Sequence, residues 1–148
     1  MSSSVLRSAG LLLAVSLQAL SAGCGSGKIA PVSGRITVDG QPAADLLVTF
    51  QPLGSGDNPV PGPGSYGKTE ADGSYRLKLS DGTERAGAMI CKHRVEIRAP
   101  LKANPKDPEG AQVAGKLIIP RKYNAESKLQ IDVEAGGTTA ADFEVKTR

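Results

Sequence analysis

Short stretches in which apolar and polar residues alternate recur along this chain. The most regular alternation lies in residues 69–79 (TEADGSYRLKL), where Tyr75, Leu77 and Leu79 share one face. A period of two residues is the pattern of a strand with one buried face. Asp72-Gly73 precedes the alternation and is a pair that favours tight turns, so this stretch predicts a β-hairpin.

The same alternation predicts further strands at residues 32–38, 46–51, 65–70, 92–99, 128–134 and 140–146. Turn-forming pairs separate them: Asp39-Gly40 reverses the chain after the first, and Gly136-Gly137 joins the last two. Residues 53–64 are rich in Pro and Gly, and residues 100–114 are rich in Pro and charge. These two stretches predict exposed loops, the second of them mobile. No segment after residue 24 shows a helical period.

Seven or eight short strands with one apolar face each can bury those faces only by packing two sheets together. The sequence therefore predicts an all-β fold, a seven- or eight-stranded antiparallel, Ig-like β-sandwich that follows an N-terminal signal peptide. Apolar residues make up 39% of the chain but aromatic residues only 3%, so the core must consist of Val, Ile, Leu and Ala. Removing 23 N-terminal residues leaves 148 − 23 = 125, the size of one domain.

The N-terminus has the pattern of an export signal, residues 1–23. An apolar run over residues 9–20 follows Arg7, and it is too short to span a bilayer. The box Leu20-Ser21-Ala22-Gly23-Cys24 resembles a bacterial lipoprotein signal, in which the Cys thiol receives a diacylglyceryl group. The resemblance implies that Cys24 is the lipid-attachment residue, that residues 24–30 are a flexible tether, and that the protein is exported and anchored to the cell envelope through its lipid.

The two cysteines leave alternatives open. In the lipoprotein family the position of Ser21 is usually Leu, and an ordinary signal cut near Ser21 or Gly23 would leave Cys24 unmodified. If Cys24 is acylated, Cys91 is left alone beside a predicted strand, where we expect a buried or half-buried packing residue. A Cys24–Cys91 disulfide is the remaining alternative.

Six motifs recur in a recognisable order: VSGRITVDGQP at 32–42, VTFQP at 48–52, TEADGSYRL at 69–77, KHRVEI at 92–97, IPRKYN at 119–124 and FEV at 143–145. Together they resemble the carboxypeptidase regulatory-like domain, a transthyretin-like (prealbumin-like) sandwich found in many small bacterial lipoproteins. The family more often has Pro and Gly where this chain has Met89-Ile90-Cys91. The resemblance implies one such domain at residues 31–148, a non-catalytic envelope module.

Few residues suggest chemistry. His93 is the only histidine and lies on a predicted apolar face, so we expect a packing residue with one hydrogen bond. One His and one Cys in the body of the chain cannot form a zinc site of usual spacing, and no G-x-S-x-G motif is present. The sequence therefore predicts no catalytic residue, no metal site and no cofactor.

Charged residues predict turns and a solvated surface. Three aspartates each precede a glycine, a pairing typical of turns rather than of calcium sites: Asp39, Asp72 and Asp81. Lys92, Arg94 and Arg98 form a basic stripe on the polar face of one strand, which Glu96 interrupts. Because the net charge is only +3 and aromatic residues are scarce, the stripe predicts a solvated face and no nucleic-acid partner.

The sequence thus predicts a non-catalytic, lipid-anchored envelope module with a structural or protein-interaction role. Its partner is expected to be an envelope protein or polysaccharide that contacts loops 53–64 and 100–114. The alternative is a carbohydrate- or small-ligand-binding domain at the cell surface. That role would need exposed aromatic rings, for which Tyr66 and Tyr123 are the candidates, since Tyr75 is expected in the core.

Overall fold

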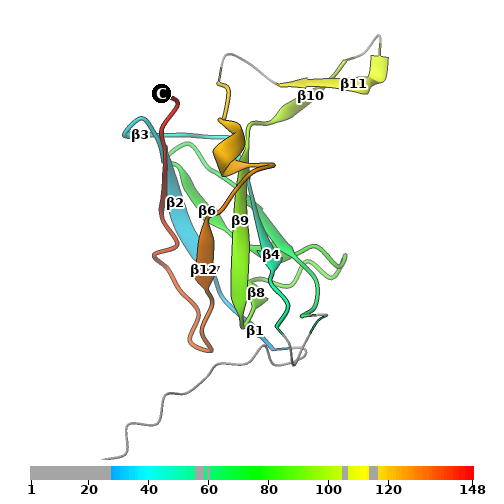
Figure 1. Cartoon of the computed structure of the whole chain (residues 1–148), viewed down its shortest axis with the longest axis vertical. Helices are drawn as coiled ribbons and strands as arrows, with labels where there is room; N and C mark the ends of the chain where they lie inside the picture. The colour runs from blue at the N-terminus through cyan, green and yellow to red at the C-terminus, as the bar shows by residue number, and fades with distance from the viewer. Residues whose placement is uncertain (1–27, 56–58, 60, 105–106, 114–116) are drawn as a thin grey trace, which may run out of the picture.

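The computed structural model describes residues 28–55, 59, 61–104, 107–113 and 117–148, and for residues 101–113 it describes the backbone alone. Within these residues the chain is all-β, and its only helical element is the 3₁₀ turn η1 (Arg121–Tyr123) (Figure 1). The strands are β1 (Ile29–Ala30), β2 (Ser33–Val38), β3 (Gln41–Pro42), β4 (Leu47–Pro52), β5 (Ser65–Lys68), β6 (Ser74–Arg76), β7 (Lys78–Leu79), β8 (Ala88–Met89), β9 (Lys92–Arg98), β10 (Leu101–Asn104), β11 (Asp107–Val113), β12 (Gln130–Asp132) and β13 (Phe143–Val145).

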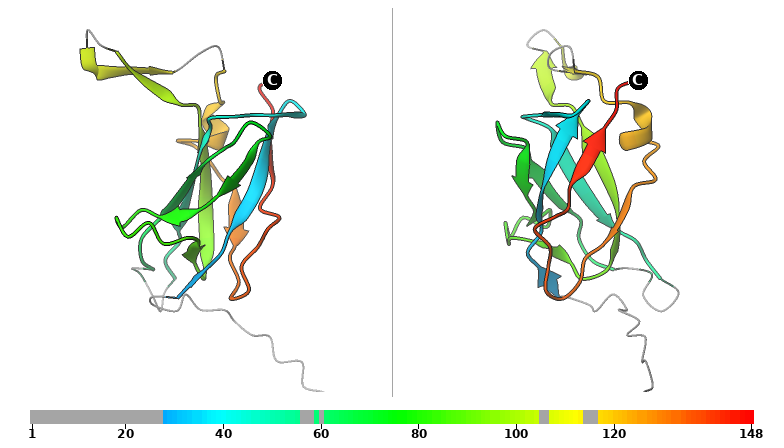
Figure 2. Two further views of the ribbon diagram at one scale, coloured as in Figure 1. Left: turned by 180° about the vertical axis from the view of Figure 1, so that it is seen from behind. Right: turned by 90° about the vertical axis from the view of Figure 1, so that its left-hand side faces the viewer.

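Two main sheets form the two layers of a β-sandwich (Figure 2). The larger is antiparallel, with strand order β12-β9-β4-β5-β7. In the smaller sheet β2 pairs with β13, β3 and β6. The predicted sandwich is confirmed, with one exception to its antiparallel pairing, because β13 runs parallel to β2.

The core lies between the two layers and comes from the alternating residues that the sequence identified. In the larger sheet Val48 and Phe50 of β4 and Val95 of β9 are fully buried. Ile36 and Val145 face them from the smaller sheet, also with no exposed surface. Each buried residue of this size contributes roughly 1.5–3 kcal/mol relative to full exposure, so the alternation accounts for the layering.

The predicted hairpin at residues 69–79 is correct at its turn but wrong in its pairing. Gly73 adopts a left-handed φ of 79°, as the Asp72-Gly73 turn requires. The strand after the turn does not return along β5 over its whole length. Instead β6 pairs with β2 in the smaller sheet, and only β7 pairs with β5. The crossing point is Leu77, whose N–H donates to Val32 of the smaller sheet at 3.0 Å.

Residues 100–114 also differ from the prediction of a mobile loop. The backbone of β10 and β11 forms an antiparallel hairpin, which we call the arm, with Lys102 opposite Gln112. In Figures 1 and 2 the arm stands off the sandwich at one end. Pro108 lies within β11, which is compatible with pairing because each strand of a two-stranded sheet has an open edge.

The two ends of the sandwich differ. β1 pairs with β8 at one end, so Ile29 and Ala30, which the sequence placed in the tether at 24–30, belong to a strand. The arm and the C-terminus lie at the other end (Figure 1). The expected loop at 53–64 carries no named strand among its described residues. A chain that enters at β1 therefore presents the arm at the far end of the sandwich.

Candidate interaction surface

Cys91 and His93 are buried beside each other in the body of the fold. Cys91 is 3% exposed and His93 is fully buried, and Sγ lies 3.6 Å from Nε2. The Nε2 atom is also 2.8 Å from the Met89 carbonyl oxygen, while Nδ1 has no hydrogen-bond partner among the described residues. Burial lowers the pKa of His93 and favours the neutral ring. The predictions that both residues pack in the interior are confirmed. Cys24 lies outside the described residues.

Each of the three tyrosines already has a hydrogen bond within the protein. Tyr75 is 2% exposed and donates its hydroxyl to the Ala141 carbonyl at 2.6 Å, which confirms its predicted place in the core. The Tyr66 hydroxyl lies 3.1 Å from a Glu84 carboxylate oxygen, and the Lys146 N–H donates to the Tyr123 hydroxyl at 3.0 Å. A lysine ammonium also lies over each of the Tyr66 and Tyr123 rings, at 5.0 and 5.1 Å from their centroids. A sugar ring would have to share these aromatic surfaces with the lysines.

The three Asp-Gly aspartates accept hydrogen bonds within the fold. Asp72 accepts a hydrogen bond from the Ser74 N–H and Asp81 one from the Thr83 N–H, both at 2.9 Å. The Thr147 N–H donates to the Asp39 carboxylate, with N 3.0 Å from Oδ1, and this bond fixes the C-terminal segment to the turn after β2. Within the described ranges, no group of three or more His, Cys, Asp or Glu side chains is placed to hold a metal ion.

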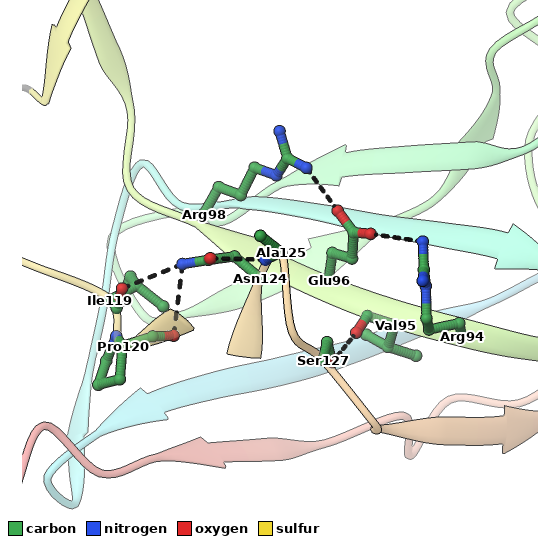
Figure 3. Close-up of polar contacts among 9 residues, drawn as sticks. All are labelled: Arg94, Val95, Glu96, Arg98, Ile119, Pro120, Asn124, Ala125 and Ser127. Carbon is green, nitrogen blue, oxygen red and sulfur yellow. Dashed lines mark hydrogen bonds and ion pairs between the residues drawn. The ribbon is translucent and has the colours of Figure 1, made fainter. Parts of the chain in front are cut away.

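The outer face of β9 carries a charged cluster that the sequence only partly predicted. Glu96 was expected on a solvated face, but its side chain is only 9% exposed. Its two carboxylate oxygens accept from two arginines (Figure 3): Arg94 Nη2 lies 2.9 Å from Oε1 and Arg98 Nη2 lies 2.6 Å from Oε2. The arginine side chains remain 44% and 54% exposed. We call these three residues the arginine clamp.

Neighbouring strands and a loop hold the clamp in place. Glu96 is in register with Thr49 of β4, and Arg98 with Leu47. Along the other edge of β9, the Ser127 hydroxyl donates to the Val95 carbonyl at 2.5 Å. The loop before Ser127 is itself braced, since the Asn124 amide donates to the Ile119 carbonyl at 3.0 Å (Figure 3). The backbone that carries the clamp is therefore fixed on both sides.

A groove with a volume of about 920 Å³ lies where the strand 74–79 crosses between the sheets. Four cations line it, and three of them already form ion pairs: Arg35 with Asp72, Lys68 with Asp45, and Lys78 with Glu84. Two carboxylates, Glu70 and Asp142, also line the groove. Its charges are therefore nearly balanced, and they favour neither an anionic nor a cationic ligand.

Sequence reasoning identified the basic stripe but missed the clamp. The signal available was the spacing Arg94-x-Glu96-x-Arg98 on one strand face, since residues two apart share a face.

Among the described residues, no helix is long and apolar enough to cross a membrane. No family model, curated protein or solved structure matches this chain.

Proposed function

We propose that this chain is a lipid-anchored, non-catalytic module of the cell envelope that binds a protein partner. The observation that carries the proposal is the arm, whose two strands pair with each other and with no other named strand. An isolated two-stranded hairpin is at best marginally stable in water. The outer edges of β10 and β11 also offer backbone donors and acceptors to an incoming strand. A protein partner would supply both the missing stability and the missing hydrogen bonds.

The position of the arm supports the same role. β1 lies at the end of the sandwich away from the arm (Figure 1), so an anchor at Cys24 would direct the arm away from the membrane. The lipid itself rests on the sequence box at residues 20–24. Replacing Cys24 with Ser should move the protein from the membrane fraction to the soluble fraction, and a variant that still sediments with membranes would contradict the anchor.

The interaction role is tested by photocrosslinking in intact cells. A photoreactive residue replaces Lys102 or Gln112, which face each other across the arm. The control replaces the exposed Glu134, in the turn after β12, and this turn lies beside β1 because the Thr138 N–H donates to the Pro31 carbonyl. We expect a protein adduct of one defined mass from the arm positions and none from the control. Equal labelling at all three positions, or no adduct from the arm, would refute the proposal.

Binding of a small ligand or carbohydrate is the second candidate, and the groove is the observation that favours it. Its volume of about 920 Å³ lies within the usual range for ligand sites. Tyr66 lines the groove and Tyr123 lies outside it, so the two aromatic candidates can be separated. Glycan-array binding that is abolished by Tyr66→Ala and retained by Tyr123→Ala would support this candidate.

A further inference from the structure

We propose that the arginine clamp of β9 is the contact for an acidic, extended segment of the protein partner. This inference rests on the proposed interaction role and specifies its chemistry. The clamp lies next to the arm, because Arg98 is the last residue of β9 and the arm begins at Leu101. A partner strand that reached the arm would therefore come close to Arg98, whose guanidinium shares the Glu96 carboxylate with that of Arg94.

The charge of the clamp favours a carboxylate ligand. Two guanidinium groups share one carboxylate, so the cluster keeps a net charge of +1. Each guanidinium has five N–H donors and contacts Glu96 through Nη2, which leaves donors on the exposed part of each side chain. Carboxylates match the planar fork of arginine well.

Glu96 fixes the spacing of the two arginines. Their Nη2 atoms are separated by no more than the contacts of 2.9 and 2.6 Å plus the width of one carboxylate. Alternate side chains of an extended chain are spaced about 6.6 Å apart, which is comparable to this upper limit on the separation of the Nη2 atoms. A strand with acidic residues at positions i and i+2 would therefore meet both arginines. Since Glu96 already orders them, binding loses less side-chain entropy than with mobile arginines.

The surroundings favour a protein over other polyanions. Leu47 is 38% exposed and lies directly opposite Arg98 in the register of β4 and β9. Ile118 is 73% exposed and lies on the segment that leads into η1, the element that contacts β9. Apolar side chains beside arginine are characteristic of protein interfaces. A phosphate-bearing polymer would contact the arginines through its phosphates and would not bury these apolar side chains.

The test measures binding of two synthetic peptides by fluorescence polarisation, using the full chain purified in detergent. The peptides have the same composition, with two glutamates at positions i and i+2 in one and at i and i+4 in the other. We expect the i,i+2 peptide to bind at least threefold more tightly. Arg94→Gln and Arg98→Gln should each weaken it fivefold or more. Arg85→Gln, an exposed arginine in the loop between β7 and β8, is the matched control and should change nothing.

Glu96→Gln tests the positioning role of the carboxylate. This variant adds positive charge, so simple attraction predicts equal or tighter binding of both peptides. If Glu96 sets the spacing, the preference for the i,i+2 peptide should disappear, with a ratio close to 1. Thermal unfolding of each variant checks that the fold is retained, and Glu96→Ala serves if Glu96→Gln does not fold.

Three results would overturn the inference: the arginine variants bind like Arg85→Gln, the Glu96 variant keeps the preference, or neither peptide binds. A further measurement tests binding of the protein to vesicles that contain phosphatidylglycerol. Binding to vesicles that depends on the arginines, without peptide binding, would assign the clamp to lipid headgroups and refute it. The crosslinking test uses the arm alone, so a clamp that fails here would leave an adduct at Lys102 unaffected.

Discussion

Tyr75→Phe removes one buried oxygen atom, and its effect can be derived from the structure. The hydroxyl donates to the Ala141 carbonyl at 2.6 Å and links β6 to the segment before β13. Tyr75 and Ala141 are 2% and 1% exposed, so water cannot replace the lost donor. A net hydrogen bond is worth about 1 kcal/mol, and an unsatisfied buried acceptor costs about 1–3 kcal/mol.

We therefore expect Tyr75→Phe to lower the free energy of unfolding by about 2 kcal/mol. For a domain of this size the melting temperature should fall by roughly 8 °C. The assay is urea unfolding with the m value held equal between variants. Tyr66→Phe is the matched control, since its hydroxyl bonds to Glu84 at an exposed site, and its effect should stay within about 0.5 kcal/mol.

The same variant has a signature in its pH dependence. Burial raises the pKa of Tyr75 above its usual value of 10.0, and the nearby charge of Asp142 adds to this effect. Above pH 10 the unfolded chain ionises this tyrosine while the folded chain keeps it neutral, so folding loses stability as the pH rises. The stability difference between wild type and Tyr75→Phe should narrow between pH 8 and pH 11. A difference below 0.5 kcal/mol at pH 8, or one that does not narrow, would refute the reasoning.

Two further substitutions test other parts of the fold. Gly34→Ala places a Cβ atom 2.0 Å from the Ala141 carbonyl oxygen, so urea unfolding should show a loss of about 1–3 kcal/mol or more. Gly136→Ala, whose Cβ would meet nothing within 4 Å, should change stability little, and equal losses would contradict the close approach. Burial lowers the pKa of His93, so wild-type stability should fall as the pH drops below 6.5, where the unfolded chain takes up a proton. His93→Gln should show a flatter dependence between pH 7.5 and pH 5, and unchanged slopes would show that His93 ionises equally in both states.

Most of the sandwich could be predicted from the sequence because its strands follow a local rule. Val48 and Phe50 alternate with polar residues, and the structure buries both completely. Asp39 and Gly40, with φ of 48° and 81°, form the predicted reversal. The burial of alternate residues and the reversal of the chain both depend on neighbours in the sequence. An alternating pattern followed by a turn pair is therefore enough to predict them.

The unpredicted features depend on partners far away in the sequence. β6 pairs with β2 rather than β5, and the Leu77 N–H donates to the Val32 carbonyl, contacts that alternation alone cannot reveal. The sequence also predicted a loop at 100–114, since Pro105 and Pro108 disfavour the interior of a sheet. Both strands of an isolated hairpin are edge strands, and Pro108 is tolerated in an edge strand.

The burial of Glu96 was missed although its two partners are close in the sequence, and it bears on function. An alternating strand places Glu96 on the outer face, but the close approach of Arg94 and Arg98 removes it from solvent. Replacing such an ionic cluster with apolar residues is often neutral or stabilising, so the burial of Glu96 is weak evidence that the clamp stabilises the sandwich. What the carboxylate adds is order, because it holds two exposed guanidinium groups at a defined spacing beside the arm. A rigid pair of cations next to unpaired strand edges is suited to an extended acidic chain. The backbone of such a chain would pair with an edge of the arm, and its carboxylates would bind the arginines of the clamp.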